Sequence, residues 1–319
     1  MASNNGYILL TGRANPKLAK DIAKILKKEL LEPITIFSDG EIRVRIARNL
    51  RRRHVFIIQP TCPPCVNDYI MELILMIDAV KRASASEIIA VIPYFGYSRQ
   101  DRKEMPRVPI SASAIASMIE HTGANRIVTV DIHAEQEEGF IRSPWDNLYA
   151  SYSLLPVIKS RNLKNLVVAS PDKGGVVRAT GYAKLLDAEG IAIVYKQRDI
   201  NVNDKSESQI IIGDVVGKDV LLVDDLISTG GTIINAGDYI KERGARSVRA
   251  AVTHQLFTGS AFESVTNSAI EEFIITDTVA VRNEVVKHKK ITVVSVAPLL
   301  AQAISRIESG ESISKDLIL

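Results

Sequence analysis

The chain has 319 residues, of which 46% are hydrophobic and 24% charged, so it is long enough to bury one or two substantial cores. Its formal net charge of +3 is too small to indicate the clustered basic surface that is typical of bulk nucleic-acid binding. No apolar run approaches the roughly 18 residues of a membrane span, and the N-terminus has no basic-then-apolar signal, so a cytoplasmic enzyme is the default expectation.

Short apolar runs alternate with longer helical patterns along most of the chain. The runs are nearly continuous and rich in β-branched residues, which is typical of parallel strands that are covered on both faces. The pattern therefore predicts an α/β fold with mainly parallel sheets flanked by helices, and ligand sites at the carboxyl ends of strands. Strands are expected at 54–60, 87–94, 126–133, 165–170, 192–196, 219–225, 247–254, 271–277 and 291–298, with long helices at 68–83 and 231–245.

Three polar features come before residue 66. In FSDGE (37–41), a hairpin turn at Asp39-Gly40 is the simplest structural explanation. The arginine-rich run 48–53 precedes an expected strand and indicates a solvated turn. The only cysteines, Cys62 and Cys65, could form half a zinc site or a redox pair, but no second Cys/His pair follows at finger spacing. A reduced pair in a loop is therefore favoured.

Two polar segments follow expected strands in the middle of the chain. PYFGYSRQDRK (93–103) is a charged loop with aromatic neighbours, compatible with a solvated surface or with a ligand site. DIHAEQ (131–136) places Asp131 and His133 at a strand end, two residues apart and so on one face. Because Mg²⁺ prefers oxygen ligands, chemistry alone favours a core or capping role for His133.

An internal repeat divides the chain into two similar halves. Residues 118–134 align without gaps on residues 239–255, and each copy reads as helix, Gly-Ala turn and strand, with His133 or His254 at the strand end. Two tandem α/β domains are therefore expected, at 1–149 and 150–319. The ordinary interpretation, a core histidine, is kept for His254.

The stretch VLLVDDLISTGGT (220–232) carries the strongest local signal. A strand brings Asp224 and Asp225 to its carboxyl end, and Thr229 to Thr232 open a helix whose unpaired N-terminal amides suit a phosphate. Glycines let the backbone close on such an anion, and carboxylates suit vicinal hydroxyls or a metal about one sugar ring away. A sugar phosphate meets both requirements. The stretch is not the GxxxxGK[ST] loop of ordinary nucleotide kinases.

Six motifs together resemble one family. FSDGE (37–41), residues 66–85, PYFGYSRQDRK (93–103), DIHAEQEEGF (131–140), SPDKGG (170–175) and VDDLISTGGT (223–232) occur in the order and spacing of the ribose-phosphate pyrophosphokinases, or phosphoribosyl diphosphate synthetases. The resemblance runs nearly end to end. It implies two tandem phosphoribosyltransferase-type domains, and transfer of the diphosphoryl group of Mg-ATP to the anomeric hydroxyl of ribose 5-phosphate. The products would be 5-phosphoribosyl 1-diphosphate and AMP, for nucleotide biosynthesis.

The resemblance also implies a role for each motif. The first domain would supply the ATP-binding elements but no sugar-phosphate loop, and the second would supply the pyrophosphate loop, a catalytic lid and the ribose 5-phosphate loop. Mg²⁺ would be the metal, with His133 and Asp172 near it. The implied residues are Phe37, Asp39, Glu41, Arg99, Gln100 and Asp101 for ATP, Asp172, Lys173, Gly174 and Gly175 for pyrophosphate, Lys196 and Arg198 for catalysis, and Asp224, Asp225, Ser228, Thr229, Gly230, Gly231 and Thr232 for ribose 5-phosphate.

Further expectations concern the lid, the assembly and one departure. Lys196 and Arg198 lie in the polar stretch 194–208, which predicts a mobile loop. The resemblance implies a dimer-based homo-oligomer, a hexamer, in which FSDGE reaches the ATP of a neighbouring subunit; neither nucleic acid nor membrane is an expected partner. Ser228 stands where the family usually has an acidic residue, so one carboxylate fewer would face the sugar.

Two alternatives stay open. A base phosphoribosyltransferase would share the sugar-phosphate loop but has one α/β half and no adenine site, and FSDGE and RQDR argue against it. A non-catalytic regulatory homologue would be a partner subunit or a DNA-binding repressor. The repressor would need a recognition helix or an added domain, and neither is evident; the silent partner would be expected to lose Lys196 or Arg198.

Overall fold

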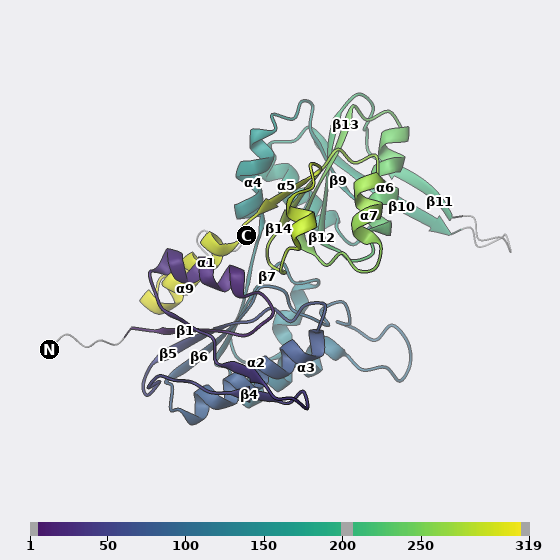
Figure 1. The fold of residues 1–319 in the computed structure, drawn as a ribbon. Helices are drawn as coiled ribbons and strands as arrows, with labels where there is room; N and C mark the ends of the chain where they lie inside the picture. The colour runs from purple at the N-terminus through teal and green to yellow at the C-terminus, as the bar shows by residue number, and fades with distance from the viewer. Residues whose placement is uncertain (1–5, 199–206, 314–319) are drawn as a thin grey trace. The chain divides into compact units, whose positions relative to one another are not determined.

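The computed structural model of the protein describes residues 6–198 and 207–313; for residues 196–198 and 207–208 it describes the backbone alone. The chain forms two compact units. Unit 1 consists of residues 1–150, 278–280 and 295–319, and unit 2 of residues 151–277 and 281–294. The catalytic expectations therefore divide between two bodies, each with its own sheet (Figure 1).

Unit 1 contains, among its described residues, a six-stranded sheet in the order β2-β1-β5-β6-β7-β8, with parallel pairing throughout. Its topology reverses at β1, since β2 lies on one side of β1 and β5 on the other. The strands are β1 (Ile8–Thr11), β2 (Leu30–Leu31), β5 (His54–Ile58), β6 (Glu87–Ile92), β7 (Arg126–Val130) and β8 (Trp145–Leu148).

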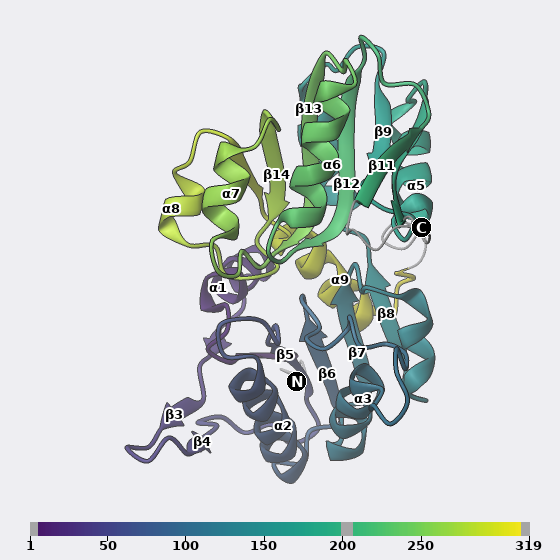
Figure 2. The ribbon, with the colours of Figure 1, turned by 90° about the vertical axis from the view of Figure 1, so that its right-hand side faces the viewer.

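Helices cover both faces of this sheet. Strand side chains such as Val55, Ile57 and Ala90 join a buried cluster with α2 and α3, while their neighbours in sequence, such as Phe56, are buried on the opposite face. Figures 1 and 2 show α1 and α9 on that opposite side, and the two helices pack on one another. The helices are α1 (Pro16–Leu26), α2 (Val66–Arg82), α3 (Ser111–Thr122), the 3₁₀ helix η1 (Glu135–Phe140) and α9 (Ala297–Ser309).

A small antiparallel hairpin stands apart from the six-stranded sheet in unit 1. It consists of β3 (Ile34–Ile36) and β4 (Ile42–Val44), with Thr35 opposite Arg43. The intervening residues 37–41 form its turn. The hairpin predicted for FSDGE is thus present.

Unit 2 contains, over its described residues, a seven-stranded sheet in the order β11-β10-β9-β12-β13-β14-β15, in which β10 and β11 alone are antiparallel. Because β9 and β12 are parallel neighbours, their carboxyl ends lie at one edge. The strands are β9 (Val167–Ser170), β10 (Gly190–Arg198), β11 (Glu207–Ile212), β12 (Asp219–Ile227), β13 (Ser247–Gln255), β14 (Glu272–Thr276) and β15 (Ile291–Val294).

The helices of unit 2 also lie on both faces of the sheet. Ile233, Ala236 and Ile240 of α6 join alternate strand residues in one buried cluster, whereas α4 and α5 pack on one another, α5 against β9 and α4 against β14. The mainly parallel α/β class is confirmed for both units. The helices are α4 (Ser151–Ser160), α5 (Val176–Leu186), α6 (Gly231–Glu242), α7 (Ala261–Asn267) and α8 (Asn283–Val286).

The C-terminal segment departs from a single division at residue 150. Residues 295–319 group with unit 1, although the expected second domain ran from 150 to 319. The physical reason is the apolar side of α9: Leu300 and Ile304 are buried, and the helix packs against α1. The internal repeat itself is present, since α3–β7 and α6–β13 are both helix–strand units.

Candidate functional site

The paired aspartates lie inside β12. The strand continues to Ile227, where the sequence pattern predicted an end at Asp225. Pairing of β12 with β9 ends at Leu222, whereas pairing with β13 continues to Ile227, so one edge of β12 is uncovered beside the aspartates. Asp225 is 7% exposed, while Asp224 is partly exposed. The two aspartates therefore lie beside the loop that follows β9.

The electrostatic surroundings of Asp224 disfavour its ionised form. Burial and then the neighbouring carboxyl of Asp225 raise the pKa of Asp224 well above its ordinary value; Arg178 opposes this shift and Asp172 adds to it. The peptide N–H of Asp225 donates to Oδ1 of Asp224 at 2.9 Å. Hydroxyl donors or cations would stabilise a crowded group of carboxylates of this kind. Arg178 was not predicted from the sequence. The only feature that indicates it is its position in the first turn of a helix that follows a glycine-rich loop.

The segment after β12 opens α6 as expected. Gly230 is the residue before the helix and has φ of +85°, a left-handed conformation that favours glycine. The helix begins at Gly231, so the amides at Gly231 and Thr232 belong to its N-terminal turn and have no partner within the helix. Thr229, Gly231 and Thr232 are exposed. The geometry suits an anion such as a phosphate monoester.

Ser228 points toward a neighbouring loop. Its hydroxyl lies 3.2 Å from that of Thr258, and its carbonyl oxygen accepts from the peptide N–H of Thr258 at 3.0 Å. Two further backbone bonds, from Leu256 and Phe257 to the carbonyl oxygen of Ile227, join the same segments. The segment 227–228 is therefore anchored to residues 256–258, which follow β13, by its backbone as well as by the serine hydroxyl.

The predicted pyrophosphate loop joins β9 to α5. Oδ1 of Asp172 accepts from the amides of Gly174 at 2.7 Å and Gly175 at 3.2 Å, while the hydroxyl of Ser170 donates to the carbonyl oxygen of Asp172 at 2.6 Å. A Cβ at Gly175 would lie 2.6 Å from the Ser170 hydroxyl, so a side chain does not fit there. Asp172 and Lys173 are exposed. The loop amides thus already donate to an anionic group, the carboxylate of Asp172, where a phosphate could bind instead.

The proposed lid residues occupy a strand. The sequence predicted a strand at 192–196 and a mobile loop over 194–208. The strand extends further than expected, since the backbones of both Lys196 and Arg198 lie in β10, opposite Gln209 and Glu207 of β11. The correction follows from pairing, because a polar segment becomes a strand when an antiparallel partner satisfies its backbone groups. Figure 1 shows β10 and β11 as an arm at one edge of the sheet. The side chains of Lys196 and Arg198, and residues 199–206, lie outside the described part of the chain.

In unit 1, the loops after β6 and β7 approach one another. Arg99 and Gln100 are exposed, and Gln136 donates its side-chain amide to Oδ2 of Asp101 at 3.0 Å. Oε1 of Gln100 accepts from the Ser111 hydroxyl at 2.6 Å, which leaves the amide nitrogen as the group that Gln100 can offer a ligand. The segment 99–101 is therefore held from two sides.

Asp131 and His133 differ in their surroundings. β7 ends at Val130 and Asp131 has φ of +40°, so the strand alternation that predicted one shared face does not extend to them. Asp131 is 3% exposed, and its Oδ2 accepts from the peptide N–H of Ala150 at 3.3 Å, whereas His133 is exposed. His254, at the end of β13, is 3% exposed, which confirms the core interpretation.

Sequence reasoning also missed a buried acid behind these loops. Glu137 is fully buried, and burial raises its pKa to about 7, although hydrogen bonds from Ser98 and the backbone of Ala134 and the charge of His133 oppose the shift. The signal in the sequence is weak, since EQEE (135–138) resembles a solvated acidic run. The structure buries one acid of this run and leaves the others largely exposed.

The FSDGE turn is exposed along its length. Phe37 is 43% exposed, and the Arg43 guanidinium lies 5.0 Å from its ring centroid. The turn is closed by the Phe37 N–H, which donates to the Glu41 carbonyl oxygen at 2.9 Å, and by Oδ1 of Asp39, which accepts from the Glu41 N–H at 3.0 Å. An exposed aromatic ring at a hairpin tip suits stacking on a planar ligand.

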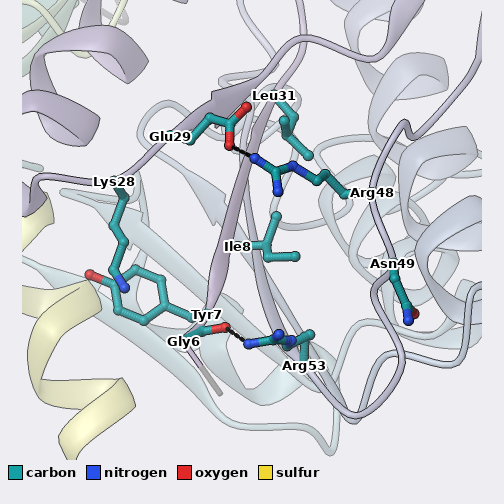
Figure 3. A pocket seen from close by; sticks show the side chains of 9 residues that line it. All are labelled: Gly6, Tyr7, Ile8, Lys28, Glu29, Leu31, Arg48, Asn49 and Arg53. Carbon is teal, nitrogen blue, oxygen red and sulfur yellow. Dashed lines mark hydrogen bonds and ion pairs between the residues drawn. The ribbon is translucent and has the colours of Figure 1, made fainter. Parts of the chain in front are cut away.

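A separate cavity of about 320 Å³ lies in unit 1 (Figure 3). None of the predicted site residues lines it. Arg48 pairs with Glu29, and Arg53 donates to the carbonyl oxygen of Gly6 at 3.0 Å, so these cations have partners within the fold. The solvated turn expected at 48–53 is present, with Arg51 and Arg52 exposed.

The described residues contain neither a ready-made metal cluster nor a helix able to span a membrane. Among the described residues, no three or more His, Cys, Asp or Glu side chains are grouped so that they could hold a metal ion. Both cysteines are free: Cys65 is exposed, and burial raises the pKa of Cys62 to about 12. Within residues 6–198 and 207–313, each helix is too short or too polar to cross a bilayer.

Family models match two parts of the chain. Residues 7–123 match the N-terminal domain of ribose phosphate pyrophosphokinase, and residues 199–317 match the phosphoribosyl synthetase-associated domain. The first match covers the sheet of unit 1 up to the end of α3, and the second begins after β10. The predicted site residues at 37–41, 99–101 and 224–232 lie within the two matches, whereas those at 133, 172–175, 196 and 198 lie between them.

Full-length relatives agree with these matches. The chain is 47% identical over 310 residues to the ribose-phosphate pyrophosphokinase of Wolinella succinogenes, covering 97% of this chain and 98% of the relative. It is 49% identical over 309 residues to that of Shewanella oneidensis, covering 96% and 97%. The crystal structure of phosphoribosylpyrophosphate synthetase from Mycobacterium smegmatis matches with a TM-score of 0.89 at 36% identity, covering 96% and 99%. Identity at this level over nearly the whole length shows that the chain belongs to the ribose-phosphate pyrophosphokinase family and is an enzyme.

Proposed function

We propose that this enzyme transfers the intact β,γ-diphosphoryl group of Mg-ATP to the anomeric hydroxyl of ribose 5-phosphate. The observation that carries the proposal is the carboxyl edge of the unit 2 sheet, where Asp224, Asp225 and the N-terminus of α6 lie beside the loop of Asp172. One edge thus offers acceptors for sugar hydroxyls, amides for a phosphate monoester and a second anion loop. A sugar phosphate that receives a diphosphate uses all three.

Ribose 5-phosphate fits the β12–α6 segment in one orientation. Its phosphate takes the amides at Gly231 and Thr232, with the hydroxyls of Thr229 and Thr232 as further donors. Its ring hydroxyls donate to Asp224 and Asp225. Since Asp224 is crowded by other carboxylates, such donors relieve repulsion that the free protein retains.

The diphosphate fits the β9–α5 loop. In the free protein, the amides of Gly174 and Gly175 donate to the Asp172 carboxylate. A diphosphate that took these amides would release Asp172, which could then turn toward a cation on the phosphates. Anion binding and metal binding would in this way be coupled at one side chain.

The nucleotide is assigned to Arg99, Gln100 and Asp101, together with Phe37, Asp39 and Glu41 of the exposed hairpin. An arginine at position 99 suits bidentate phosphate contacts, and the ring of Phe37 suits adenine. The 43% exposure of Phe37 favours a hairpin that serves a neighbouring subunit in a homo-oligomer, a hexamer built from dimers by the family resemblance.

Mg²⁺ is the metal that fits these residues. The described part of the chain has no cluster of three ligands, and Mg²⁺ characteristically binds through one or two protein groups plus substrate phosphates. His133 and Asp172 are the candidate protein ligands. When bound to the triphosphate, Mg²⁺ supplies charge neutralisation at the reacting phosphoryl group.

The reaction needs positioning and charge stabilisation rather than a covalent nucleophile. The anomeric oxygen attacks the β-phosphorus in line, the bond from that phosphorus to the α-phosphate oxygen breaks, and AMP leaves. Lys196 and Arg198 are assigned to the negative charge that spreads over the transferred group. Closure of the segment that carries them would exclude water from the phosphates.

Formation of AMP is the direct test. The purified protein, incubated with Mg-ATP, should form AMP and 5-phosphoribosyl 1-diphosphate in equal amounts only when ribose 5-phosphate is present. AMP formation without the sugar phosphate, or none with it, would contradict the proposal. A base phosphoribosyltransferase would instead release pyrophosphate when given 5-phosphoribosyl 1-diphosphate and a base, and a regulatory homologue would turn over neither pair.

Sharing of the site between subunits has its own test. Phe37→Ala and Lys196→Ala, each expected to have much reduced activity alone, are mixed after unfolding and refolded together. If each site takes Phe37 from one chain and Lys196 from another, an equal mixture regains about a quarter of its sites. Activity that stays at the level of the parents, with subunit exchange confirmed by mass, would show that one chain supplies both residues.

A further inference from the structure

Two loops at the carboxyl edge of the unit 1 sheet are joined by a buried hydrogen-bond group. β6 and β7 are parallel neighbours, with Ile92 opposite Thr129, so the chain segments that follow them emerge side by side. The hydroxyl of Ser98, in the segment after β6, donates to Oε1 of Glu137 in η1 at 2.6 Å. Ser98 is 5% exposed, and Glu137 is fully buried.

The same two side chains also hold the turn that carries His133. The peptide N–H of His133 donates to the Ser98 hydroxyl oxygen at 3.0 Å, and the peptide N–H of Ala134 donates to Oε1 of Glu137 at 3.2 Å. One hydroxyl therefore accepts from the 133 turn while it donates to Glu137. The backbone of Ser98 leads directly into Arg99, Gln100 and Asp101.

Stability alone does not account for this arrangement. Oε2 of Glu137 is buried without a hydrogen-bond partner among the described residues. Burying a carboxylate with one oxygen unsatisfied costs free energy, and an apolar pair of similar volume at positions 98 and 137 would avoid that cost. The pair provides geometry instead, because a short buried hydrogen bond in a low-dielectric interior is directional.

We propose that Ser98 and Glu137 are positioning residues that lock segment 98–101 to the turn at 133–134, so that the groups for Mg-ATP on the two segments are held in register. The inference rests on the proposed function, since it takes Arg99, Gln100, Asp101 and His133 as groups for Mg-ATP. Neither Ser98 nor Glu137 touches the substrate in this scheme.

The first test is nucleotide binding without turnover. Calorimetry with the magnesium complex of a non-hydrolysable ATP analogue should give a dissociation constant for Ser98→Ala that is higher than that of the unchanged protein by on the order of 3- to 10-fold, the effect of losing one directional hydrogen bond. Ser151→Ala is the matched control, because Ser151 is buried and its hydroxyl has no partner among the described residues. We expect no change in binding for that control.

Glu137 offers a conservative variant that separates the acceptor from the charge. Glu137→Gln keeps Oε1 as an acceptor for Ser98 and Ala134, and should bind the analogue nearly as the unchanged protein does. Glu137→Ala removes the acceptor and should match Ser98→Ala. If the two residues act through one contact, the double variant Ser98→Ala/Glu137→Ala should bind no more weakly than the weaker single variant.

Kinetics distinguish positioning from general loss of structure. For Ser98→Ala, the KM for Mg-ATP should rise while the KM for ribose 5-phosphate changes less than about twofold, with a thermal transition that stays cooperative. Equal changes in both constants, additive effects in the double variant, or analogue binding within twofold of the unchanged protein would each overturn the inference.

These experiments distinguish failure of the proposed reaction from failure of the positioning inference. If the unchanged protein binds the analogue but forms no AMP with ribose 5-phosphate, the proposed reaction fails while the positioning inference is still decided by the binding series. If the unchanged protein binds no analogue, the positioning inference fails with it.

Discussion

At the amino end of β12, Asp219 accepts hydrogen bonds from Nε of Arg246 at 2.8 Å, the Ser247 hydroxyl at 2.7 Å and the peptide N–H of Lys164 at 2.7 Å. At the carboxyl end of the same strand, Asp224 lies beside Asp225 and near Asp172. The guanidinium of Arg246 holds the pKa of Asp219 well below its ordinary range, whereas burial and Asp225 raise that of Asp224.

The ionised aspartates at the two ends of β12 therefore have opposite effects on the stability of the fold. The ionised carboxylate of Asp219 stabilises the fold, because the native state supplies donors that the unfolded chain lacks. The ionised carboxylate of Asp224 destabilises the fold at neutral pH, because the native state removes it from water and also places it beside other acids. The difference separates the structural end of the sheet from the end that is available to a ligand, and four predictions test this division.

The largest effect is expected at the carboxyl edge, in Lys196→Ala. Its kcat should fall by on the order of 10² to 10⁴, while binding of Mg-ATP changes little, because the loss is of charge stabilisation in the transition state. Rapid-quench measurement of AMP formation, alongside equilibrium binding of the nucleotide, separates the two effects. Near-normal turnover would remove this residue from the mechanism.

Asp224→Asn should lower activity and raise stability together. The loss of a charged acceptor for a ring hydroxyl should reduce kcat/KM for ribose 5-phosphate by roughly 10- to 100-fold. Since the folded pKa of Asp224 lies above its unfolded value, the native carboxylate is penalised at pH values above the folded pKa, and the penalty disappears as the pH falls below the unfolded pKa.

The melting temperature of Asp224→Asn should therefore exceed that of the unchanged protein at neutral pH, and the two should converge near pH 3. Thermal unfolding followed by circular dichroism across this range provides the measurement. A variant that is less stable at neutral pH would contradict the raised pKa.

Asp219→Asn should show the reverse pattern. Removing the carboxylate that faces Arg246, Ser247 and Lys164 should lower the free energy of unfolding by about 1–3 kcal/mol at neutral pH, while kcat/KM of the folded protein is unchanged. Because the folded pKa is depressed, this contribution is present above the unfolded pKa and is lost as the pH falls through the folded value. Urea denaturation at neutral and acid pH measures the loss of stability and its pH dependence. A large loss of activity in this variant would contradict the division of β12 into a structural end and a ligand-binding end.

The smallest effect is expected for Ser228→Asp. The added acid gives the sugar one more acceptor, so the KM for ribose 5-phosphate should fall by on the order of 3- to 10-fold with little change for ATP. The backbone bond from Thr258 to the Ser228 carbonyl oxygen does not depend on the side chain, so the loop should keep its position. If the KM values for ribose 5-phosphate and ATP shifted equally, the assignment of this loop to ribose 5-phosphate would be wrong.

The sequence predicted the central strands better than the edges of the sheets. EIIAVIPY indicated a strand at 87–94, and β6 occupies Glu87–Ile92. The strands β1, β2, β8 and β11 were not predicted. β2, β8 and β11 lie at sheet edges, where pairing with one neighbour defines them, whereas β1 is a four-residue interior strand that the pattern missed. Pairing with a neighbour also extends β10 to Arg198, although the expected strand ended at residue 196 and the polar stretch from residue 194 indicated a loop.

Local motifs were predictable where a single backbone segment carries the chemistry. The turn at FSDGE, the opening of α6 after Gly230 and the glycine loop after β9 follow from residue types within a few positions of one another. The exposure of Asp131 and His133 was not predictable in this way, because the strand ends at Val130 and the chain turns at Asp131.

By itself, the sequence determined the α/β class, the repeated helix–strand design and the loops that offer amides and carboxylates to anions and sugars, because these depend on periodicity and on neighbouring residues. The tertiary structure decided which acids are buried and beside what. Ser98 and Glu137 meet across 39 positions of sequence, and Asp224 lies among carboxylates that parallel pairing of β9 and β12 brings to one edge. Solvation and charge–charge interactions depend on distance in space, so the pKa of Asp224 and that of Asp219 diverge although the residues lie on one strand.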